Sequence, residues 1–295
     1  MKKVFLAVVA AVGILTGCTT QTDVVQSEVH GDYTQYVNPL MGTQSSFELS
    51  TGNTYPAIAM PWGMNFWTPR TNKIGDGWQY TYTANKIYGF EQTHQPSPWI
   101  NDYGQFSLMP VTGEVEMDEK KRASWFSHKG EVALPHYYKV YLAEYDVVTE
   151  MAPTERASMF RFTFPDADSY VVVDAYDRGS SIKVIPEENK IIGYTTRNSG
   201  GVPENFKNYF VVVFDKPFTY KATFSNDVKP AKPDATVPVT LKEGQLEQTN
   251  FHTGAVIGFK TQKGEKVHAR VASSFISPEQ AELNLKELGN DNFDT

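Results

Sequence analysis

The chain has 295 residues, enough for one large domain or two small ones, and a formal net charge of −7. This acidic balance argues against a nucleic-acid partner, because phosphate surfaces are bound by clustered Lys and Arg side chains. The 16 Tyr and 18 Phe residues bring the aromatic content to 13%, which favours strands over helices.

The first residues read as an export signal. Met1-Lys2-Lys3 forms a charged head, and residues 4–15 form an apolar run that is too short for a stable membrane span. Leu15-Thr16-Gly17-Cys18 resembles the lipobox of bacterial lipoproteins, so Cys18 is predicted to be the lipidation site. The alternative is an ordinary signal peptide with a chance cysteine. Because Cys18 is the only cysteine, no disulfide is expected.

The predicted order is a signal peptide with its lipobox cysteine (1–18), a flexible polar tether (19–32) and then the folded part. The anchor would hold an exported protein to a bacterial membrane, at the periplasmic face or the cell surface, with contact to the membrane through lipid only. Which of these two faces carries the protein stays open.

Residues 33–276 are predicted to form a mostly β domain, a large antiparallel β-sandwich of two packed sheets. Polar and apolar residues alternate at 114–117, 137–142 and 157–164, as in half-buried strands. Residues 170–174 and 209–214 are continuous apolar runs, which indicates strands buried on both faces. Turn residues recur at intervals of about ten, the spacing of antiparallel sandwiches. The basic cluster 120–122 is expected on a solvated turn.

A linker helix is predicted within residues 277–295. Ser277 is a good N-cap and Pro278 suits the first helical position. Ala281, Leu285 and Leu288 would share one face. We expect a segment downstream of the helix to pack on that face.

The segment from Gly52 to Gly104 carries the functional signal. Four of the five tryptophans occur there, among prolines and glycines rather than in a periodic apolar run. Asn, Asp, His and Gln side chains lie between them. A sugar ring stacks its C–H face on indole while its hydroxyls bond amides and carboxylates, so a carbohydrate site is favoured. The alternative is that the tryptophans fill the ends of the sandwich. They are Trp62, Trp67, Trp78 and Trp99.

Other polar groups were weighed for catalysis or metal binding. His94 is either a structural histidine or a ligand of a sugar hydroxyl. Asp174 and Asp177 could form a carboxylate pair, but a strand end with a solvated turn is the favoured interpretation. The six histidines include no His-x-x-x-His pair, and no acidic cluster has EF-hand spacing. No metal ligand is therefore assigned.

An ordered series of motifs resembles a known family. Gly52-Asn53-Thr54-Tyr55-Pro56 and Pro61-Trp62-Gly63-Met64 are similar to segments of family-92 glycoside hydrolases, the calcium-dependent exo-α-mannosidases. Similar segments follow in the same order, and the resemblance covers about residues 33–289. These segments are Tyr88-Gly89-Phe90, Thr93-His94, Asp102-Tyr103-Gly104, Thr154-Glu155-Arg156, Tyr209-Phe210, Lys216-Pro217-Phe218, 273–277 and Glu279-Gln280-Ala281. The chain departs from the family at Glu91-Gln92 and in residues 95–99.

The resemblance implies the N-terminal β-sandwich of a two-domain enzyme, truncated before an (α/α)₆ barrel that supplies the catalytic carboxylates and most calcium ligands. Calcium is accordingly expected in the complete enzyme and not for this chain alone, and no catalytic residue is assigned. Whether the chain is itself an enzyme is left open, with inactivity in isolation expected. The expected partners are α-mannoside glycans and the barrel, and Trp99 resembles α-1,2-specific members. The predicted substrate-binding residues are Asn53, Trp78, His94, Trp99, Asp102 and Asn198. The alternative function is a free-standing mannoside-binding surface lipoprotein.

Overall fold

A computed structural model describes residues 32–44, 54–71, 79–94, 102–229 and 237–295. Thr34–Thr295 forms one compact unit. The predicted signal peptide, Cys18 and nearly all of the tether lie outside the described residues. Asn53, Trp78 and Trp99 also lie outside them.

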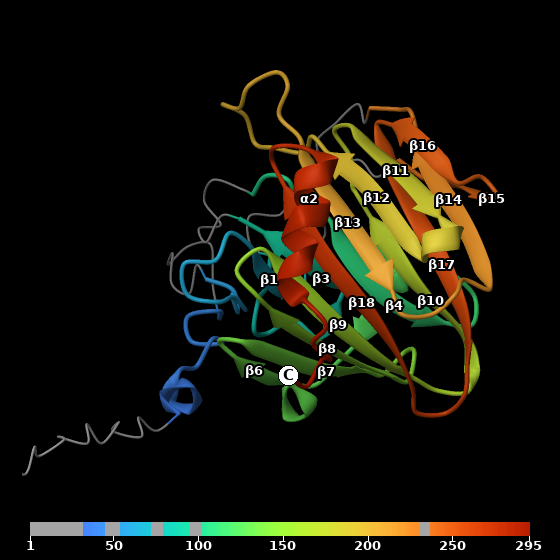
Figure 1. Cartoon of the computed structure of the whole chain (residues 1–295). Coiled ribbons are helices and arrows are strands. Elements are labelled where there is room, and N and C mark those ends of the chain that lie inside the picture. The colour runs from blue at the N-terminus through green and yellow to red at the C-terminus, as the bar shows by residue number, and fades with distance from the viewer. Residues whose placement is uncertain (1–31, 45–53, 72–78, 95–101, 230–236) are drawn as a thin grey trace, which may run out of the picture. The chain divides into compact units, whose positions relative to one another are not determined.

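Two large sheets make up the unit, and all their strand pairs are antiparallel (Figure 1). The seven-stranded sheet has the order β1 (Phe66–Arg70), β3 (Gly89–Thr93), β4 (Ser107–Thr112), β10 (Ala167–Asp174), β17 (His252–Thr261), β14 (Tyr220–Asn226), β15 (Thr240–Glu243). The nine-stranded sheet has the order β16 (Glu247–Asn250), β11 (Ser180–Ile185), β12 (Lys190–Thr195), β13 (Asn208–Phe214), β18 (Glu265–Ser274), β9 (Ala157–Phe164), β8 (Val147–Pro153), β7 (Tyr137–Leu142), β6 (Val132–Leu134). The predicted mostly β antiparallel fold is confirmed.

Short elements complete the described fold. A two-stranded sheet pairs β2 (Lys86–Ile87) with β5 (Ser124–Trp125). The helical elements are η1 (Tyr33–Tyr36), α1 (Glu119–Arg122), η3 (His128–Gly130), η4 (Pro186–Glu188), α2 (Pro278–Leu285) and η5 (Lys286–Leu288).

The larger apolar core of the described residues combines side chains of both sheets. Trp67 of β1 is fully buried, and its ring meets Phe106 and Phe160 edge-on with centroids 5.7 and 5.0 Å apart. Phe160 belongs to β9 in the other sheet, so these rings join the two layers. Edge-to-face packing is the favoured geometry for such aromatic pairs. For Trp67, filling the sandwich core is therefore the correct interpretation.

Two local predictions are wrong around residues 114–122. Residues 114–117 form no strand; they lead into α1, where the Asp118 carboxylate accepts from the Lys120 and Lys121 amides and caps the helix. The cluster 120–122 is not simply a solvated turn, since Arg122 is 2% exposed and lies 3.5 Å from Asp174. Its carboxylate partner is distant in sequence, so the short charged run did not reveal the burial.

Helix α2 begins where predicted, with the Ser277 hydroxyl accepting from the Gln280 amide. Its apolar face, with Ala281 and Leu285, packs together with Leu288 of η5 on the outer face of the nine-stranded sheet (Figure 1). Small residues there, among them Ala157 and Ala272, leave room for the helix. The expectation that a downstream segment covers this face is thus wrong, because the chain covers it with its own sheet.

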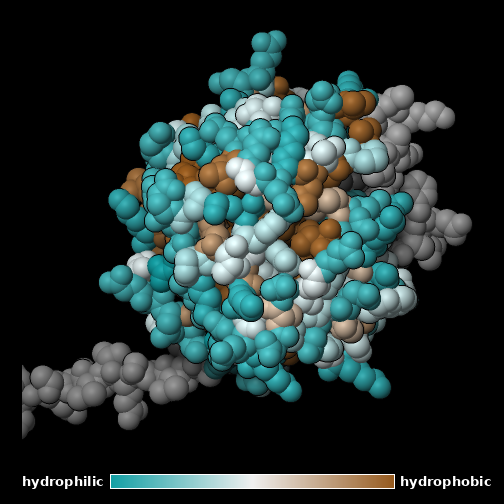
Figure 2. All heavy atoms as spheres, turned by 90° about the vertical axis from the view of Figure 1, so that its right-hand side faces the viewer, coloured by the Kyte–Doolittle hydropathy of each residue, from teal (hydrophilic) through white to brown (hydrophobic). Residues whose placement is uncertain are grey.

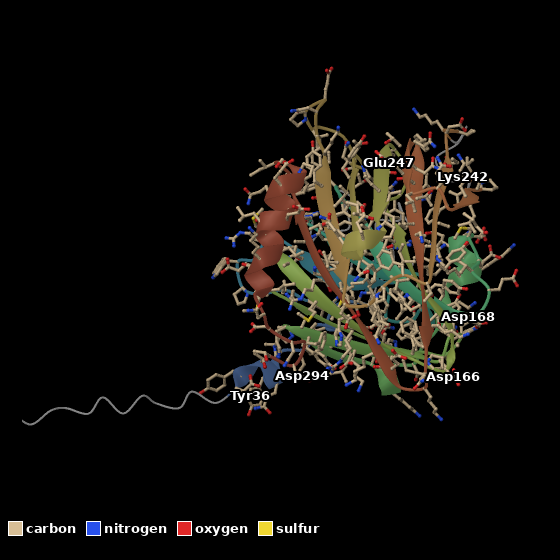
Figure 3. All side chains as sticks on the ribbon, turned by 45° about the vertical axis from the view of Figure 1, so that its right-hand side comes forward. Tyr36, Asp166, Asp168, Lys242, Glu247 and Asp294 are labelled. Atoms are coloured by element: carbon tan, nitrogen blue, oxygen red, sulfur yellow. The ribbon has the colours of Figure 1, made fainter. Side chains whose placement is uncertain are left out.

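The residues after α2 continue over the same sheet. Arg161 of β9 bonds Glu150 through two nitrogens, at 2.6 and 2.7 Å, and donates to Asp294 at 2.6 Å. The Phe293 ring lies 4.2 Å from the Arg161 guanidinium carbon. Figure 3 shows Asp294 beneath α2 on the outside of the molecule. The last residues are therefore held against β8 and β9.

The side of the molecule that carries β14, β15 and β17 is largely polar at its surface. Figure 2 shows hydrophobic residues there in several separate groups, each bordered by hydrophilic ones. Scattered apolar exposure of this kind is normal for a solvated protein surface. This face therefore gives no functional signal.

Candidate functional site

Strand registers bring many chain segments to one edge of the sandwich. Phe66 at the start of β1 pairs with Thr93 at the end of β3, and Tyr209 pairs with Ser274 at the end of β18. The two sheets meet there, because the Gly104 amide donates to the Arg197 carbonyl at 2.8 Å. We call this the His94 edge; it comprises the strand-end residues His94, Asp102–Gln105, Asp174–Arg178, Thr195–Asn198 and Phe275.

His94 and Asp102 form the compact centre of this edge. The His94 amide donates to both carboxylate oxygens of Asp102 at 3.0 Å, and the Tyr103 amide donates to one of them at 2.8 Å. Gln79 Nε2 adds a longer bond of 3.3 Å. Burial raises the pKa of Asp102 above its ordinary value, against these amide contacts, which lower it. Asp102 therefore braces the loop around His94.

The His94 ring has a defined tautomer. Its Nδ1 lies 2.8 Å from the Tyr103 carbonyl oxygen, which can only accept, so Nδ1 carries the hydrogen. Burial lowers the pKa of His94, although the Asp102 carboxylate raises it. In the resulting neutral ring Nε2 is a hydrogen-bond acceptor. The Tyr103 and Phe275 rings lie next to it, with centroids 5.4 and 4.9 Å away, and their own centroids are 5.9 Å apart.

Arg197 connects three loops of the His94 edge. Its guanidinium contacts Asp177 and donates to Gln105 Oε1 at 3.3 Å. The backbone carbonyl of Arg197 accepts the Gly104 amide bond described above, and the side chain is 5% exposed. Burial lowers the pKa of Arg197 despite the nearby Asp177 carboxylate. Such a buried, paired cation fixes the relative positions of the loops it joins.

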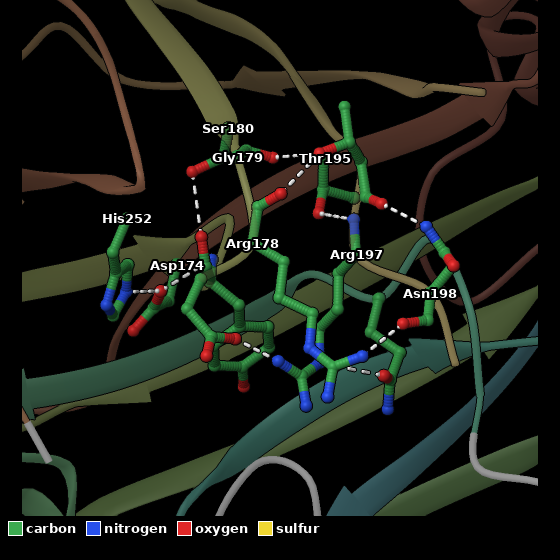
Figure 4. A network of polar contacts seen from close by, with 12 residues as sticks. Asp174, Arg178, Gly179, Ser180, Thr195, Arg197, Asn198 and His252 are labelled. Atoms are coloured by element: carbon green, nitrogen blue, oxygen red, sulfur yellow. Dashed lines mark hydrogen bonds and ion pairs between the residues drawn. The ribbon is translucent and has the colours of Figure 1, made fainter. Parts of the chain in front are cut away.

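Asn198 directs its amide into its own loop. Nδ2 donates to the Thr196 carbonyl and Oδ1 accepts from the Gly200 amide, both at 2.8 Å. Arg178 also bonds the Asn198 carbonyl, and Figure 4 shows Arg178 and Arg197 beside each other in this network. These bonds support the loop.

Asp174 is the last residue of β10 and Arg178 is exposed in the bend that follows, as expected for a strand end with a solvated turn at Arg178-Gly179. Asp174 is 4% exposed and lies 2.7 Å from His252 Nε2, as Figure 4 shows, while Asp177 pairs with Arg197. Burial alone would lower the pKa of His252, but the Asp174 carboxylate raises it. Both aspartates are thus bound to cations, which removes the need for solvent around them.

A second buried carboxyl, Glu91, lies next to this network. Gln105 Nε2 donates to Glu91 Oε1 at 3.0 Å, and Arg70 Nε lies 3.3 Å from Glu91 Oε2. Arg70 also donates to Glu119 at 2.9 Å. Burial raises the pKa of Glu91 to about 7, although the Arg70 guanidinium lowers it. Because Arg70 is shared with the closer Glu119, it compensates the Glu91 charge only in part.

Within the described ranges, no group of three or more His, Cys, Asp or Glu side chains comes together that could hold a metal ion. In addition, none of the described helices is both long and apolar enough to cross a membrane.

The comparison with known families decides the identity. The sequence profile described as "Glycosyl hydrolase family 92 N-terminal domain" matches residues 36–274. The chain belongs to this family. The resemblance inferred from the motifs is confirmed, and the match covers the sandwich through the end of β18. Among curated proteins, none matches the chain.

Solved structures of family 92 mannosidases share the fold. The inverting mannosidase BT2199 from Bacteroides thetaiotaomicron is 47% identical with a TM-score of 0.80, over 88% of this chain and 34% of that one. The α-mannosidase BT3965 from the same organism is 31% identical with a TM-score of 0.75, over 88% and 35%. The family 92 hydrolase ccman5, at 24% identity and a TM-score of 0.70 over 89% and 35%, agrees in fold. This family 92 domain thus spans about a third of the mannosidases it matches.

Of the six predicted substrate contacts, this family 92 domain brings His94 and Asp102 together, whereas Asn198 belongs to the neighbouring loop. Asn53, Trp78 and Trp99 lie outside the described residues. Two features of the edge were not predicted from the sequence: the buried carboxyl of Glu91 and the edge-to-face contact of Phe275 with His94. The resemblance series did include the segment with Phe275, but no local pattern indicates that it reaches His94.

Proposed function

We propose that this chain is the substrate-binding N-terminal part of an α-mannosidase that acts in glycan degradation. The main support is the 47% identity with an inverting mannosidase over 88% of the chain. A second support is that BT3965, 31% identical over 88% of this chain, was solved in complex with mannoimidazole. The substrate class is accordingly an α-mannoside, and the α-1,2 linkage is the one that Trp99 favours.

The His94 edge is the surface proposed to meet the sugar. His94 Nε2 is an acceptor that a sugar hydroxyl can donate to, and the neighbouring Tyr103 and Phe275 rings support the imidazole. Trp99 is proposed to stack on the sugar, and Asn53, Trp78 and Asn198 to contribute further contacts. Asp102 acts in this scheme by holding the backbone that carries His94.

We assign the cleavage of the glycosidic bond to the catalytic barrel of the enzyme. An inverting glycosidase needs two carboxyl groups about 6.5–9.5 Å apart across the scissile bond. In our proposal the catalytic barrel, on the same or a separate chain, supplies both groups and most of the calcium ligands. Calcium would support catalysis in that complete enzyme. The role of this chain's own residues is to bind and orient the glycan.

The test uses a fusion protein. This chain replaces the matched 34% of BT2199 and is followed by the rest of BT2199. The chain alone should release no mannose from α-1,2-mannobiose and bind it only in the millimolar range, because one stacked ring and one or two hydrogen bonds barely offset the cost of association. The joined protein should release mannose. Trp99→Ala or His94→Phe should lower its kcat/KM about tenfold, equivalent to about 1.4 kcal/mol. His94→Phe keeps an aromatic ring in contact with Tyr103 and Phe275.

Two results would contradict the proposal. Calcium-dependent mannose release by the chain alone would make it an enzyme in its own right. Tight mannobiose binding by the chain alone would instead support the free-standing capture lipoprotein. Trp125→Ala, at an exposed site on β5, is the matched control and should leave kcat/KM unchanged.

We also propose that the chain is exported and lipid-anchored at Cys18. The charged head, the short apolar run and the lipobox-like Leu15-Thr16-Gly17-Cys18 support this. An extracytoplasmic location fits an enzyme part that meets glycans.

A further inference from the structure

Trp62 combines two unusual properties. Its side chain is fully exposed, with a relative exposure of 101%, and its backbone φ is +64°. A bulky residue in the left-handed region is a genuine outlier, because its Cβ approaches the following carbonyl oxygen. An exposed tryptophan in addition contributes no burial to the fold. Strain of this kind persists where the surroundings impose it and is concentrated at functional sites.

The surroundings do impose this conformation. The Gly63 amide donates to the Met60 carbonyl at 3.0 Å, which closes a tight turn around Trp62. The Met64 amide donates to the Glu155 carbonyl at 2.7 Å, and Asn65 Nδ2 bonds the same carbonyl at 3.1 Å. A Cβ on Gly63 would meet the Met60 carbonyl at 3.0 Å, so the turn is closely packed.

A residue after α2 also contacts the segment that holds this turn. Glu287 of η5 accepts from the Thr154 hydroxyl at 2.8 Å and from the Arg156 amide at 2.7 Å. It also pairs with the Arg156 guanidinium at 3.0 Å. Residues 154–156 form the β8–β9 turn that holds Met64 and Asn65. The segment after α2 is therefore fixed next to the Trp62 turn, which we define as residues 60–64.

The side chains of the Trp62 turn match a protein interface better than a sugar site. Met60 and Met64 are 39% and 54% exposed. Trp is enriched among interface residues that dominate binding, and Met is enriched at interface cores because its side chain adapts to irregular surfaces. Sugar sites surround an aromatic ring with amides and carboxylates, whereas Trp62 lies between Pro61 and Gly63 with methionines next to them.

We propose that the Trp62 turn docks the catalytic part of an α-mannosidase, with the indole inserted into an apolar pocket of that part. This rests on the proposed function. The matched mannosidases are about three times as long as the stretch they share with this chain, so such a part exists in them. Glu287 also binds the β8–β9 turn that supports residues 60–64, so the structure holds the Trp62 turn in a fixed position for a partner.

The test compares Trp62→Gly in the full chain alone and in the chain joined to the remaining part of BT2199. Glycine adopts the left-handed region freely, so in the chain alone the Tm should stay constant or rise by a few degrees. In the joined protein the same substitution should lower the Tm of the BT2199 part by several degrees. Trp62→Asn is a second variant that tolerates this backbone region. Trp125→Ala is the control. The Trp125 carbonyl accepts from the Ala143 amide, which precedes the start of β8, whereas the Trp62 turn contacts the residues that follow the end of β8.

The outcomes separate the two proposals. If Trp62→Gly changes the Tm equally in both contexts, or lowers it by many degrees in the chain alone, the docking role is wrong. A change in tryptophan emission on adding α-1,2-mannobiose to the chain alone that is lost in Trp62→Gly would make the turn a sugar site and also overturn it. A joined wild-type protein without mannose release and without coupled unfolding would instead contradict the proposed function.

Discussion

Replacing Glu91 by glutamine should change how the stability of this domain depends on pH. The pKa of Glu91 is raised by burial to about 7 from its ordinary 4.5. In the unfolded chain the group loses its proton near the ordinary value, whereas in the folded chain it keeps the proton until about pH 7. The folded state therefore binds more protons between these values, and its stability falls as the pH rises through that window.

The magnitude follows from the shift. A shift of about 2.5 pKa units corresponds to roughly 3 kcal/mol, or roughly 6 to 12 °C in Tm for a domain of this size. Glu91 is fully buried, so solvent screening does not reduce the figure. Glutamine keeps an oxygen that can accept from Gln105 but does not titrate.

Urea unfolding of both proteins from pH 4 to pH 8 measures the effect. The wild-type free energy of unfolding should fall by about 3 kcal/mol relative to Glu91→Gln between pH 4.5 and pH 7. The absolute difference at one pH also contains the changed contact with Arg70, so the pH dependence is the decisive quantity. A difference that stays constant from pH 4 to pH 8 would mean that Glu91 is ionised throughout and that Arg70 compensates its charge.

Two further predictions concern a glycine and the anchor. Gly104→Ala should cost about 3 kcal/mol, because φ is +69° and the new Cβ would lie 2.8 Å from Asn208 Cβ. Gly113→Ala should cost only about 1 kcal/mol, since φ is +76° with nothing within 4 Å; equal losses in urea unfolding would refute the steric argument. Cys18→Ser should release the protein from the membrane fraction or leave the signal uncleaved. Unchanged fractionation together with unchanged processing would exclude the lipobox.

The strands could be predicted because their signal is local. Residues 170–174 and 209–214 are continuous apolar runs, and they are largely buried parts of β10 and β13. The cap of α2 is equally local, since Ser277 and Gln280 are three residues apart. The sequence is sufficient to predict a strand or a helix cap when the residues that determine it are close together in the chain.

The site could be predicted only in part, because its contacts join distant segments. Trp62 and Trp67 belong to the same Pro- and Gly-rich stretch, yet one is fully exposed and the other fully buried. The difference arises from Phe106 and Phe160, which reach Trp67 from other strands. The partners of Arg197 include Gln105, ninety-two residues away. Such pairs have no signature in a single sequence.

The position of β18 has a consequence for biosynthesis. This strand lies between β13 and β9 near the middle of the nine-stranded sheet, although it is the last strand of the chain. While the polypeptide emerges from the ribosome, β9 and β13 can each have one neighbour, but their other edges stay open until residue 274 has been made. Open edges invite pairing with other chains. A nascent chain of this domain is therefore a natural client for chaperones that shield exposed strands until translation reaches β18.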